Sequence, residues 1–231
     1  MFHYGSPLAH KSGTPVPRSF NPKPLAEWFV ARGWAVVLPQ RRGLASPLAT
    51  YDEGLDPRQP LAGACDPEVA LGEADRVLGD VDSVTASVLA LPFVDRGRLA
   101  VGGQSRGGAL AVAWSGRKPG IAKAVVNFSG LWLGPNCWSA DEVNQALFKI
   151  GVAAKRPSLW LYGERDPYLS VEDARRNFAA FQNDGGEASF FDFTPPYGTS
   201  GHDIVLEPKL WARDVERYLK AQGLPLRAVA P

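Results

Sequence analysis

The sequence is poor in the residues that most often build metal centres and covalent cross-links. Its 231 residues include only three histidines, two cysteines and one methionine. We expect neither a metal site nor a bound cofactor. A charge of one sign is also lacking, because 25 Lys and Arg stand against 24 Asp and Glu. With no basic run in the chain, neither nucleic acid nor an anionic membrane surface is an expected partner.

Long hydrophobic runs are absent as well. No apolar stretch approaches the length of a membrane-spanning helix. The first residues, Met1 to Pro7, do not have the pattern of a signal peptide. The chain does have hydrophobic bulk, because 45% of its residues are apolar and they include seven Trp and eleven Phe. We expect one domain over residues 1–231 with a large core.

Apolar runs alternate with segments of helical period along most of the chain. This alternation predicts an α/β fold with a mostly parallel sheet and helices on both of its faces. The first twenty residues are rich in Gly and Pro and are predicted as a loop. Residues 131–154 are predicted as a small insertion and a candidate cap. The predicted strands are 34–39, a run ending at 103, 122–128, 157–163 and 188–193, and the predicted helices are 24–32, one from 66, one after 105, one from 170 and 207–221.

The most informative stretch is Gly103-Gln104-Ser105-Arg106-Gly107, between an apolar run and a small-residue helix. This is the Gly-x-Ser-x-Gly pattern of a nucleophile elbow, where a serine sits on a sharp strand-to-helix turn. The glycines are needed because the turn brings the backbone close to its neighbours. The backbone N–H of Arg106 is then aimed at a developing oxyanion. The alternative is a glycine-rich turn that binds nothing, or a phosphate at the helix N-terminus.

A nucleophilic serine needs a base and a group that orients the base. His202 follows the last predicted strand, whereas His3 and His10 lie in the N-terminal segment. Asp166 follows the strand 157–163, at the strand end where α/β sheets carry their chemistry. Alternatives for Asp166 are a turn cap before Pro167 or an ion pair with Arg165. Glu164 and Asp203 are less suitable acids, the first because it follows the strand directly and the second because it adjoins His202.

The chain resembles the α/β-hydrolase superfamily, and within it the dienelactone-hydrolase-like branch that borders the prolyl-oligopeptidase catalytic domain. The resemblance covers nearly all 231 residues, and its motifs are 3–7, 41–43, the elbow, 163–166 and 201–202. It implies the α/β-hydrolase fold and a Ser105–His202–Asp166 triad in that family's chain order. It also implies a second oxyanion donor from the backbone N–H of Tyr4 or Gly5, with the Tyr4 hydroxyl as a further candidate. Dienelactone hydrolases carry cysteine at the elbow, so Ser105 points to ester or peptide chemistry.

At its N-terminus the chain lacks a strand that the superfamily has. In the superfamily the oxyanion turn follows a complete third strand, which lies between the strand at 34–38 and the elbow strand. Without it, buried N–H and C=O groups would lose their partners at about 1–3 kcal/mol each, against a total stability of about 5–15 kcal/mol. We therefore expect that the N-terminal strands are missing and that residues precede Met1 in the natural protein, which leaves localisation open.

The two cysteines bear on the same question. Cys65 and Cys137 both lie in loops at the carboxyl side of the predicted strands, so a disulfide is feasible and would indicate export. Two free thiols in a cytosolic enzyme are the alternative.

The predicted function is a serine hydrolase that cleaves a carboxylic ester through an acyl-enzyme. A peptidase of prolyl-oligopeptidase type and a non-catalytic binding protein on the same scaffold are the alternatives. The expected partner is a small-molecule ester or short peptide, and the oligomeric state is left open. Trp132 and Trp138 are candidate substrate contacts, although plain packing would explain both. Arg106 is a candidate for recognising an anionic substrate or for a surface salt bridge.

Overall fold

A computed structural model describes residues 2–4, 21–40, 65–224 and 226–227 of the chain. Within these residues the core is a sheet of five parallel strands, in the order β1-β2-β3-β4-β5. Each strand lies beside the one that precedes it along the chain. The strands are β1 (Phe2–Tyr4), β2 (Ala100–Gln104), β3 (Ala124–Phe128), β4 (Ser158–Gly163) and β5 (Ala188–Phe193).

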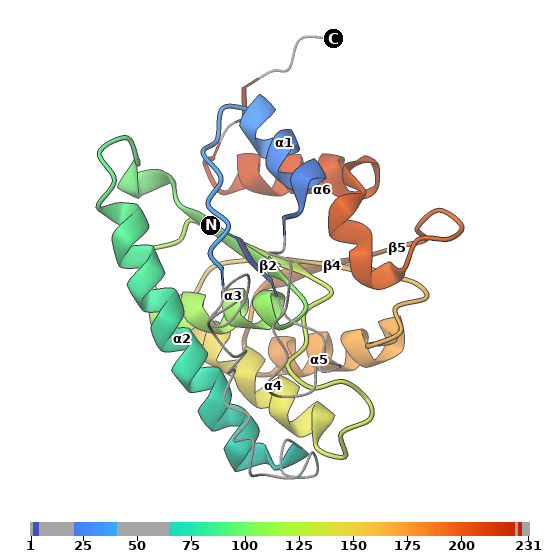
Figure 1. Ribbon diagram of the computed structural model, residues 1–231. Coiled ribbons are helices and arrows are strands. Elements are labelled where there is room, and N and C mark those ends of the chain that lie inside the picture. The colour runs from blue at the N-terminus through green and yellow to red at the C-terminus, as the bar shows by residue number, and fades with distance from the viewer. Residues whose placement is uncertain (1, 5–20, 41–64, 225, 228–231) are drawn as a thin grey trace, which may run out of the picture.

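The sequential strand order determines where the connecting helices lie. Parallel strands are joined by right-handed crossovers, so repeated steps in one direction place the crossover helices on one face of the sheet. That face carries α3 (Arg106–Arg117), α4 (Ala140–Ile150) and α5 (Val171–Asn183), with α2 (Pro67–Leu89) beside them. The other face is covered by α1 (Lys23–Ala31) and α6 (Pro208–Ala221) (Figure 1). The expectation of a parallel sheet with helices on both faces is confirmed.

The alternation of side chains along each strand builds two cores. On β3, Val125 faces the core under α2, α3 and α4, whereas Val126 and Phe128 face the core under α1 and α6. On β4, Trp160 and Tyr162 belong to the first core and Leu161 to the second. All residues of β3 and β4 are buried, as expected for strands covered on both faces.

Two helices begin at the caps that the sequence predicts. The Asp66 side chain accepts hydrogen bonds from the backbone N–H groups of Glu68 and Val69, at 3.0 and 3.1 Å, and starts α2. The Ser170 hydroxyl accepts from the N–H of Asp173 at 3.0 Å and starts α5. Such caps satisfy N–H groups that the first turn of a helix leaves without a partner.

The structure corrects two expectations for the N-terminal half. Residues 34–40 form no strand, and Trp34 and Leu38 are only half-buried against the core under α1 and α6. A strand requires a hydrogen-bonded neighbour, and among the described residues β1 pairs only with β2. The segment 2–4 is a strand rather than a loop, with Phe2, His3 and Tyr4 in register with Gly102, Gly103 and Gln104. A strand of three residues therefore lies beside the elbow strand, where we expected a complete strand to be missing, and residues upstream of Met1 stay a prediction. The Arg41-Arg42-Gly43 motif lies outside the described residues.

Most of the segment predicted as an insertion belongs to the regular fold. The helix α4 within it connects β3 to β4 and packs against α3 and α5. Its apolar side chains Val143, Leu147 and Phe148 are fully buried. Only residues 131–139, before α4, are a loop.

Candidate active site

Ser105 lies on a strained turn between β2 and α3. Its φ of 59° and ψ of −130° fall in a region that residues with a side chain rarely adopt. A Cβ at Gly103 would collide with the backbone of Gly107, which explains the glycine at that position. The Ser105 carbonyl accepts hydrogen bonds from the N–H groups of Gly108 (2.9 Å) and Leu131 (3.3 Å). The local geometry is that of a nucleophile elbow.

Asp166 and His202 lie together at the carboxyl ends of β4 and β5. His202 Nδ1 is hydrogen-bonded to Asp166 Oδ2 at 2.8 Å. The other carboxylate oxygen, Oδ1, accepts from the backbone N–H groups of Tyr168 (2.8 Å) and Leu169 (3.2 Å). The Asp166 side chain is 1% exposed and that of His202 is 10% exposed. One carboxylate oxygen therefore caps the turn and the other contacts the imidazole. The turn cap and the contact with His202, which we treated as alternatives, occur together.

The other candidate partners of Asp166 and His202 have different contacts. The Arg165 guanidinium donates to the carbonyl oxygens of Pro195 and Pro196, so the expected alternative of an Asp166–Arg165 ion pair does not occur. Glu164 accepts from the Thr194 hydroxyl at 2.9 Å. The ring of Tyr168 lies edge-on against the His202 ring, with 4.7 Å between the centroids. The imidazole is therefore fixed by a carboxylate on one side and an aromatic ring on another.

Ser105 is connected to His202 through its neighbours. The Gln104 side chain donates from Nε2 to the His202 carbonyl oxygen, and the N–H of Ser105 donates to the Phe128 carbonyl oxygen at 3.0 Å. The part of the chain that the structure describes has no hydrogen bond between the Ser105 hydroxyl and the His202 ring. Hydrogen bonds between a nucleophile and its base are often long until a substrate is bound.

The predicted oxyanion residues lie at the same end of the sheet. The residue Tyr4 ends β1 and is in register with Gln104, next to Ser105 in the chain. Gly5 lies outside the described residues. Arg106 is the first residue of α3, directly after Ser105. The backbone therefore brings Tyr4 and Arg106 next to the elbow, and their role as oxyanion donors stays a prediction.

The side chains of Arg106 and Trp132 are used for packing. The guanidinium of Arg106 donates from Nε to the Trp132 carbonyl oxygen at 3.1 Å and lies over the Trp132 ring, 4.6 Å from its centroid. Trp132 is 1% exposed and Arg106 is 5% exposed. This burial leaves Trp132 with almost no surface for a substrate, and it places the Arg106 side chain in the interior rather than at an exposed surface. Trp138, by contrast, is 75% exposed and lines a pocket with Leu169 and Arg176.

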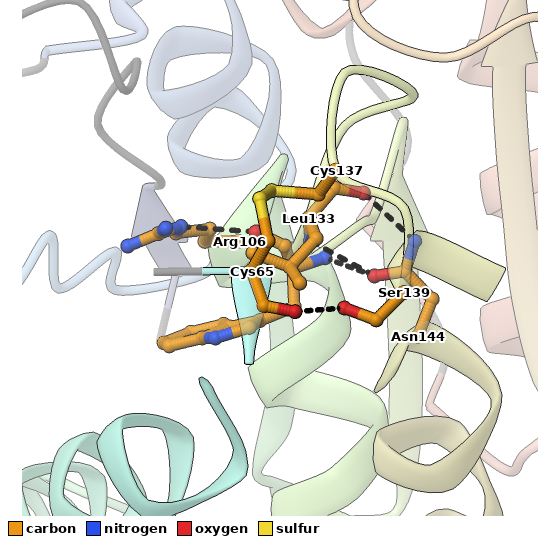
Figure 2. Close-up of a disulfide and its surroundings, with 7 residues drawn as sticks. Cys65, Arg106, Leu133, Cys137, Ser139 and Asn144 are labelled. Atoms are coloured by element: carbon orange, nitrogen blue, oxygen red, sulfur yellow. Dashed lines mark hydrogen bonds between the residues drawn. A yellow bond between two sulfur atoms is a disulfide. The ribbon is translucent and has the colours of Figure 1, made fainter. Parts of the chain in front are cut away.

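A disulfide between Cys65 and Cys137 fixes the loop that carries Trp132 (Figure 2). The bond joins the residue before the α2 cap to the loop before α4, 72 residues away in the chain. The Ser139 hydroxyl donates to the Cys65 carbonyl oxygen beside it. The structure thus decides between the two states of the cysteines that the sequence leaves open.

Asn144 holds the same loop from α4. Its Oδ1 accepts from the N–H groups of Trp132 (2.6 Å) and Leu133 (3.0 Å), and its Nδ2 donates to the Leu133 carbonyl oxygen at 2.9 Å. Because the N–H of Leu131 also donates to Ser105, the loop is attached to the elbow at one end and to α4 and the disulfide at the other.

A buried polar network lies under the elbow. Asn127 donates from Nδ2 to the Tyr162 hydroxyl at 3.1 Å, and that hydroxyl donates to the Gly130 carbonyl oxygen at 2.9 Å. Burial raises the pKa of Tyr162 far above its ordinary value, and the Asp166 carboxylate acts in the same direction. The phenol therefore stays neutral and serves as a hydrogen-bonding link between β3, β4 and the segment after β3.

Several residues at this rim gave no signal in the sequence. Ser129, Asn144 and Tyr168 belong to no motif of the chain, and their contacts, like those of Gln104, join distant segments. Gln104 occupies a variable position of the elbow motif, next to Ser105, and this position is its only signal in the sequence.

The described residues contain no group of three or more His, Cys, Asp or Glu side chains placed to hold a metal ion. None of the described helices is both long and apolar enough to span a membrane. A pocket lined by Trp34, Asp95 and Leu99 lies at the amino end of β2, the opposite end of that strand from Ser105.

Comparison with known proteins gives matches at the level of structure alone. No family model matches the sequence, and no curated protein matches it. Arabidopsis thaliana SOBER1 superimposes with a TM-score of 0.53 at 16% identity, over 96% of each chain. A candidate carboxylesterase of Lactobacillus plantarum WCFS1 gives a TM-score of 0.56 at 14% identity, over 97% of this chain and 85% of that one.

A third match is partial. A candidate dienelactone hydrolase of Klebsiella pneumoniae gives a TM-score of 0.48 at 23% identity, over 64% of this chain and 61% of that one. Together with the elbow and the strand order, the full-length matches show that this chain has the α/β-hydrolase fold. The dienelactone-hydrolase-like branch stays a prediction.

Proposed function

We propose that this protein is a serine hydrolase that cleaves a carboxylic ester through an acyl-enzyme. Ser105 is the nucleophile, His202 the general base and Asp166 the group that orients the base. The observation that carries the proposal is the buried Asp166–His202 hydrogen bond at the same rim as the strained Ser105 turn. A fold is shared by many functions, so the site rather than the fold supports the proposal.

The proposed chemistry uses these groups in sequence. His202 Nε2 takes the Ser105 proton as Oγ attacks the ester carbonyl, and Asp166 stabilises the resulting imidazolium. The N–H of Arg106 and that of Tyr4 or Gly5 hold the oxyanion of the tetrahedral intermediate. The imidazolium then protonates the leaving alcohol. Water, activated by His202, releases the acid from Ser105.

The nucleophile can be tested by covalent labelling. A fluorophosphonate probe should label the wild-type protein at Ser105 and should not label Ser105→Ala. Ser115→Ala is the matched control, since it also removes a buried serine hydroxyl, one that donates to the Val112 carbonyl oxygen within α3. Labelling of Ser105→Ala at the wild-type rate would remove Ser105 as the nucleophile.

The substrate class can be tested on one panel of substrates. We expect turnover of p-nitrophenyl esters of short or medium acyl chains. Turnover of peptide p-nitroanilides with no turnover of esters would favour the peptidase alternative. No turnover of either, with no labelling of Ser105, would favour a binding protein. Trp138 is the remaining candidate for a substrate contact, because its ring is exposed beside Leu169. Trp138→Ala should then change KM across the ester panel more than kcat.

We also propose that the protein acts in an oxidising compartment. Disulfides persist in secreted and periplasmic proteins and are rare in the reducing cytosol. The Cys65–Cys137 bond supports this location. Alkylation of protein from its native source, with and without reductant, followed by mass measurement, tests it. Two alkylated thiols in the unreduced sample would contradict the proposal.

A further inference from the structure

Two buried polar side chains outside the triad contact the loop that carries His202. Gln104, the last residue of β2, donates from Nε2 to the His202 carbonyl oxygen. Ser129, the first residue after β3, donates from its hydroxyl to the Gly201 carbonyl oxygen at 3.2 Å. The two acceptors are successive carbonyl groups of one loop. Side chains from two neighbouring strands therefore hold the backbone of the base at adjacent points.

The burial of the Gln104 side chain costs free energy. The residue is fully buried, and its Oε1 atom has no hydrogen-bond partner among the described residues. A buried polar atom without a partner costs free energy, and an apolar side chain of similar size would avoid that cost. We infer that the hydrogen bonds of the Nε2 group compensate for this cost. The shortest of them is to the His202 carbonyl oxygen.

The backbone of Ser129 is strained. Its φ of 46° lies in the left-handed region, where glycine is the relaxed residue. Glycine at this position would relieve the backbone and remove the hydroxyl that donates to Gly201. The residue is also fully buried, so its hydroxyl has no role at the surface. The strain and the contact with Gly201 thus occur together, independently of Gln104.

We propose that Gln104 and Ser129 act together as positioning residues for the general base His202. Gln104 adjoins Ser105 in the chain, so the strand end that places the nucleophile also holds the base. Neither residue reacts, because both act through the His202 backbone. The catalytic part of the proposal rests on the proposed function.

The catalytic test compares Gln104→Met and Ser129→Ala with the wild-type protein. Met fills a similar volume to Gln but lacks the donor. With the nucleophile intact and the substrate site unchanged, we expect kcat to fall about tenfold or more while KM stays within about twofold. The matched control is Ser115→Ala, whose buried hydroxyl donates within α3. It should keep the wild-type kcat at a temperature well below its Tm.

A second measurement does not depend on turnover. Hydrogen exchange of the backbone amides over 200–206 should be faster in Gln104→Met and Ser129→Ala than in the wild type or Ser115→Ala. Unchanged exchange in both variants would overturn the proposal. If both variants exchanged faster but kept the wild-type kcat, the two side chains would hold the loop without positioning the base, and the proposed positioning role would be wrong. An inactive wild type would instead refute the proposed function, and exchange would still decide whether the two side chains hold the loop.

Discussion

The residues Gly163 and Gly201 meet backbone to backbone, and a Cβ built on Gly163 would lie 2.5 Å from the Gly201 carbonyl oxygen. Gly163 ends β4, ahead of Asp166, and Gly201 precedes His202. The contact therefore sets the separation of the loops that carry Asp166 and His202. With a side chain at either position, the 2.8 Å hydrogen bond between Asp166 and His202 could not form without a shift of the backbone.

Gly201→Ala should separate these two loops. Its new Cβ would collide with the carbonyl oxygens of Glu164 and Gly163. We expect ester hydrolysis to fall about 100-fold, since a displacement of about 1 Å can have that effect. Overpacking should also lower the free energy of unfolding by about 1–3 kcal/mol. Steady-state kinetics and urea unfolding measure the two effects.

A matched control for this substitution is Gly79→Ala in α2, where a Cβ would meet nothing within 4 Å. Since alanine is the better helix former, the control should gain about 0.5–1 kcal/mol of stability and keep its activity. Wild-type activity in Gly201→Ala would show that the glycine contact does not set the geometry of the base.

Asp166→Asn should remove the carboxylate and keep its shape. An amide at this position cannot fix the imidazole tautomer or stabilise the imidazolium, so we expect kcat to fall by about 10³–10⁴-fold. Glu164→Gln is the matched control, because Glu164 contacts Thr194 instead of His202. If Glu164→Gln lost as much activity as Asp166→Asn, the assignment of the acid would be wrong.

Removal of the disulfide should lower stability. In the chain-entropy model, a bond that closes a loop of about 70 residues stabilises the folded state by about 4 kcal/mol. The Cys65→Ser, Cys137→Ser double variant should therefore have a lower Tm than the wild type. A strong reductant should lower the Tm of the wild type to a similar value and leave the double variant unchanged. Equal melting of all samples would indicate that the bond does not stabilise the fold.

Stability should also fall at alkaline pH because of two buried phenols. Burial raises the pKa of Tyr162 and Tyr218 well above the ordinary value of 10.0. Above pH 10 the unfolded chain loses these protons while the folded protein keeps them, so rising pH favours unfolding. Each phenol should reduce the free energy of unfolding by about 1.4 kcal/mol per pH unit in that range.

Urea unfolding between pH 8.5 and 11 measures this slope. Lysines also titrate in the range, so the comparison is with Tyr218→Phe. This variant loses the hydrogen bonds of Tyr218 with Val125 and Pro157 at every pH. Its slope should be smaller than that of the wild type by the contribution of one phenol. Parallel curves would show that Tyr218 ionises equally in both states.

The sequence was sufficient for the parts of this molecule that depend on local chemistry. The elbow at Ser105 requires glycine on one side and a small-residue helix on the other, and both are visible in the chain. The caps at Asp66 and Ser170 are equally local, and their helices begin where predicted. Asp166 and His202 could be paired because parallel strands place their carboxyl ends at one rim.

The parts that the sequence did not predict depend on neighbours. Residues 34–39 have the apolar composition of a buried strand, but composition does not supply a hydrogen-bonded partner. Phe2 to Tyr4 stand at the start of a segment rich in Gly and Pro, yet they pair with β2 because its edge offers N–H and C=O groups. The contacts of Gln104 and Ser129 join residues 98 and 72 positions apart, beyond the reach of any local pattern.

The sequential strand order has a consequence for synthesis on the ribosome. Each strand of the order β1 to β5 joins an edge that already exists, so the sheet can grow in the direction in which the chain emerges. Gln104 and Ser105 are made one after the other, and Ser129 follows with the next strand. His202, which these two residues hold, comes only after the last strand of the sheet. Under the proposed function, a nascent chain therefore carries its serine long before it has a base, and it gains ester hydrolysis only when the loop at 201 docks.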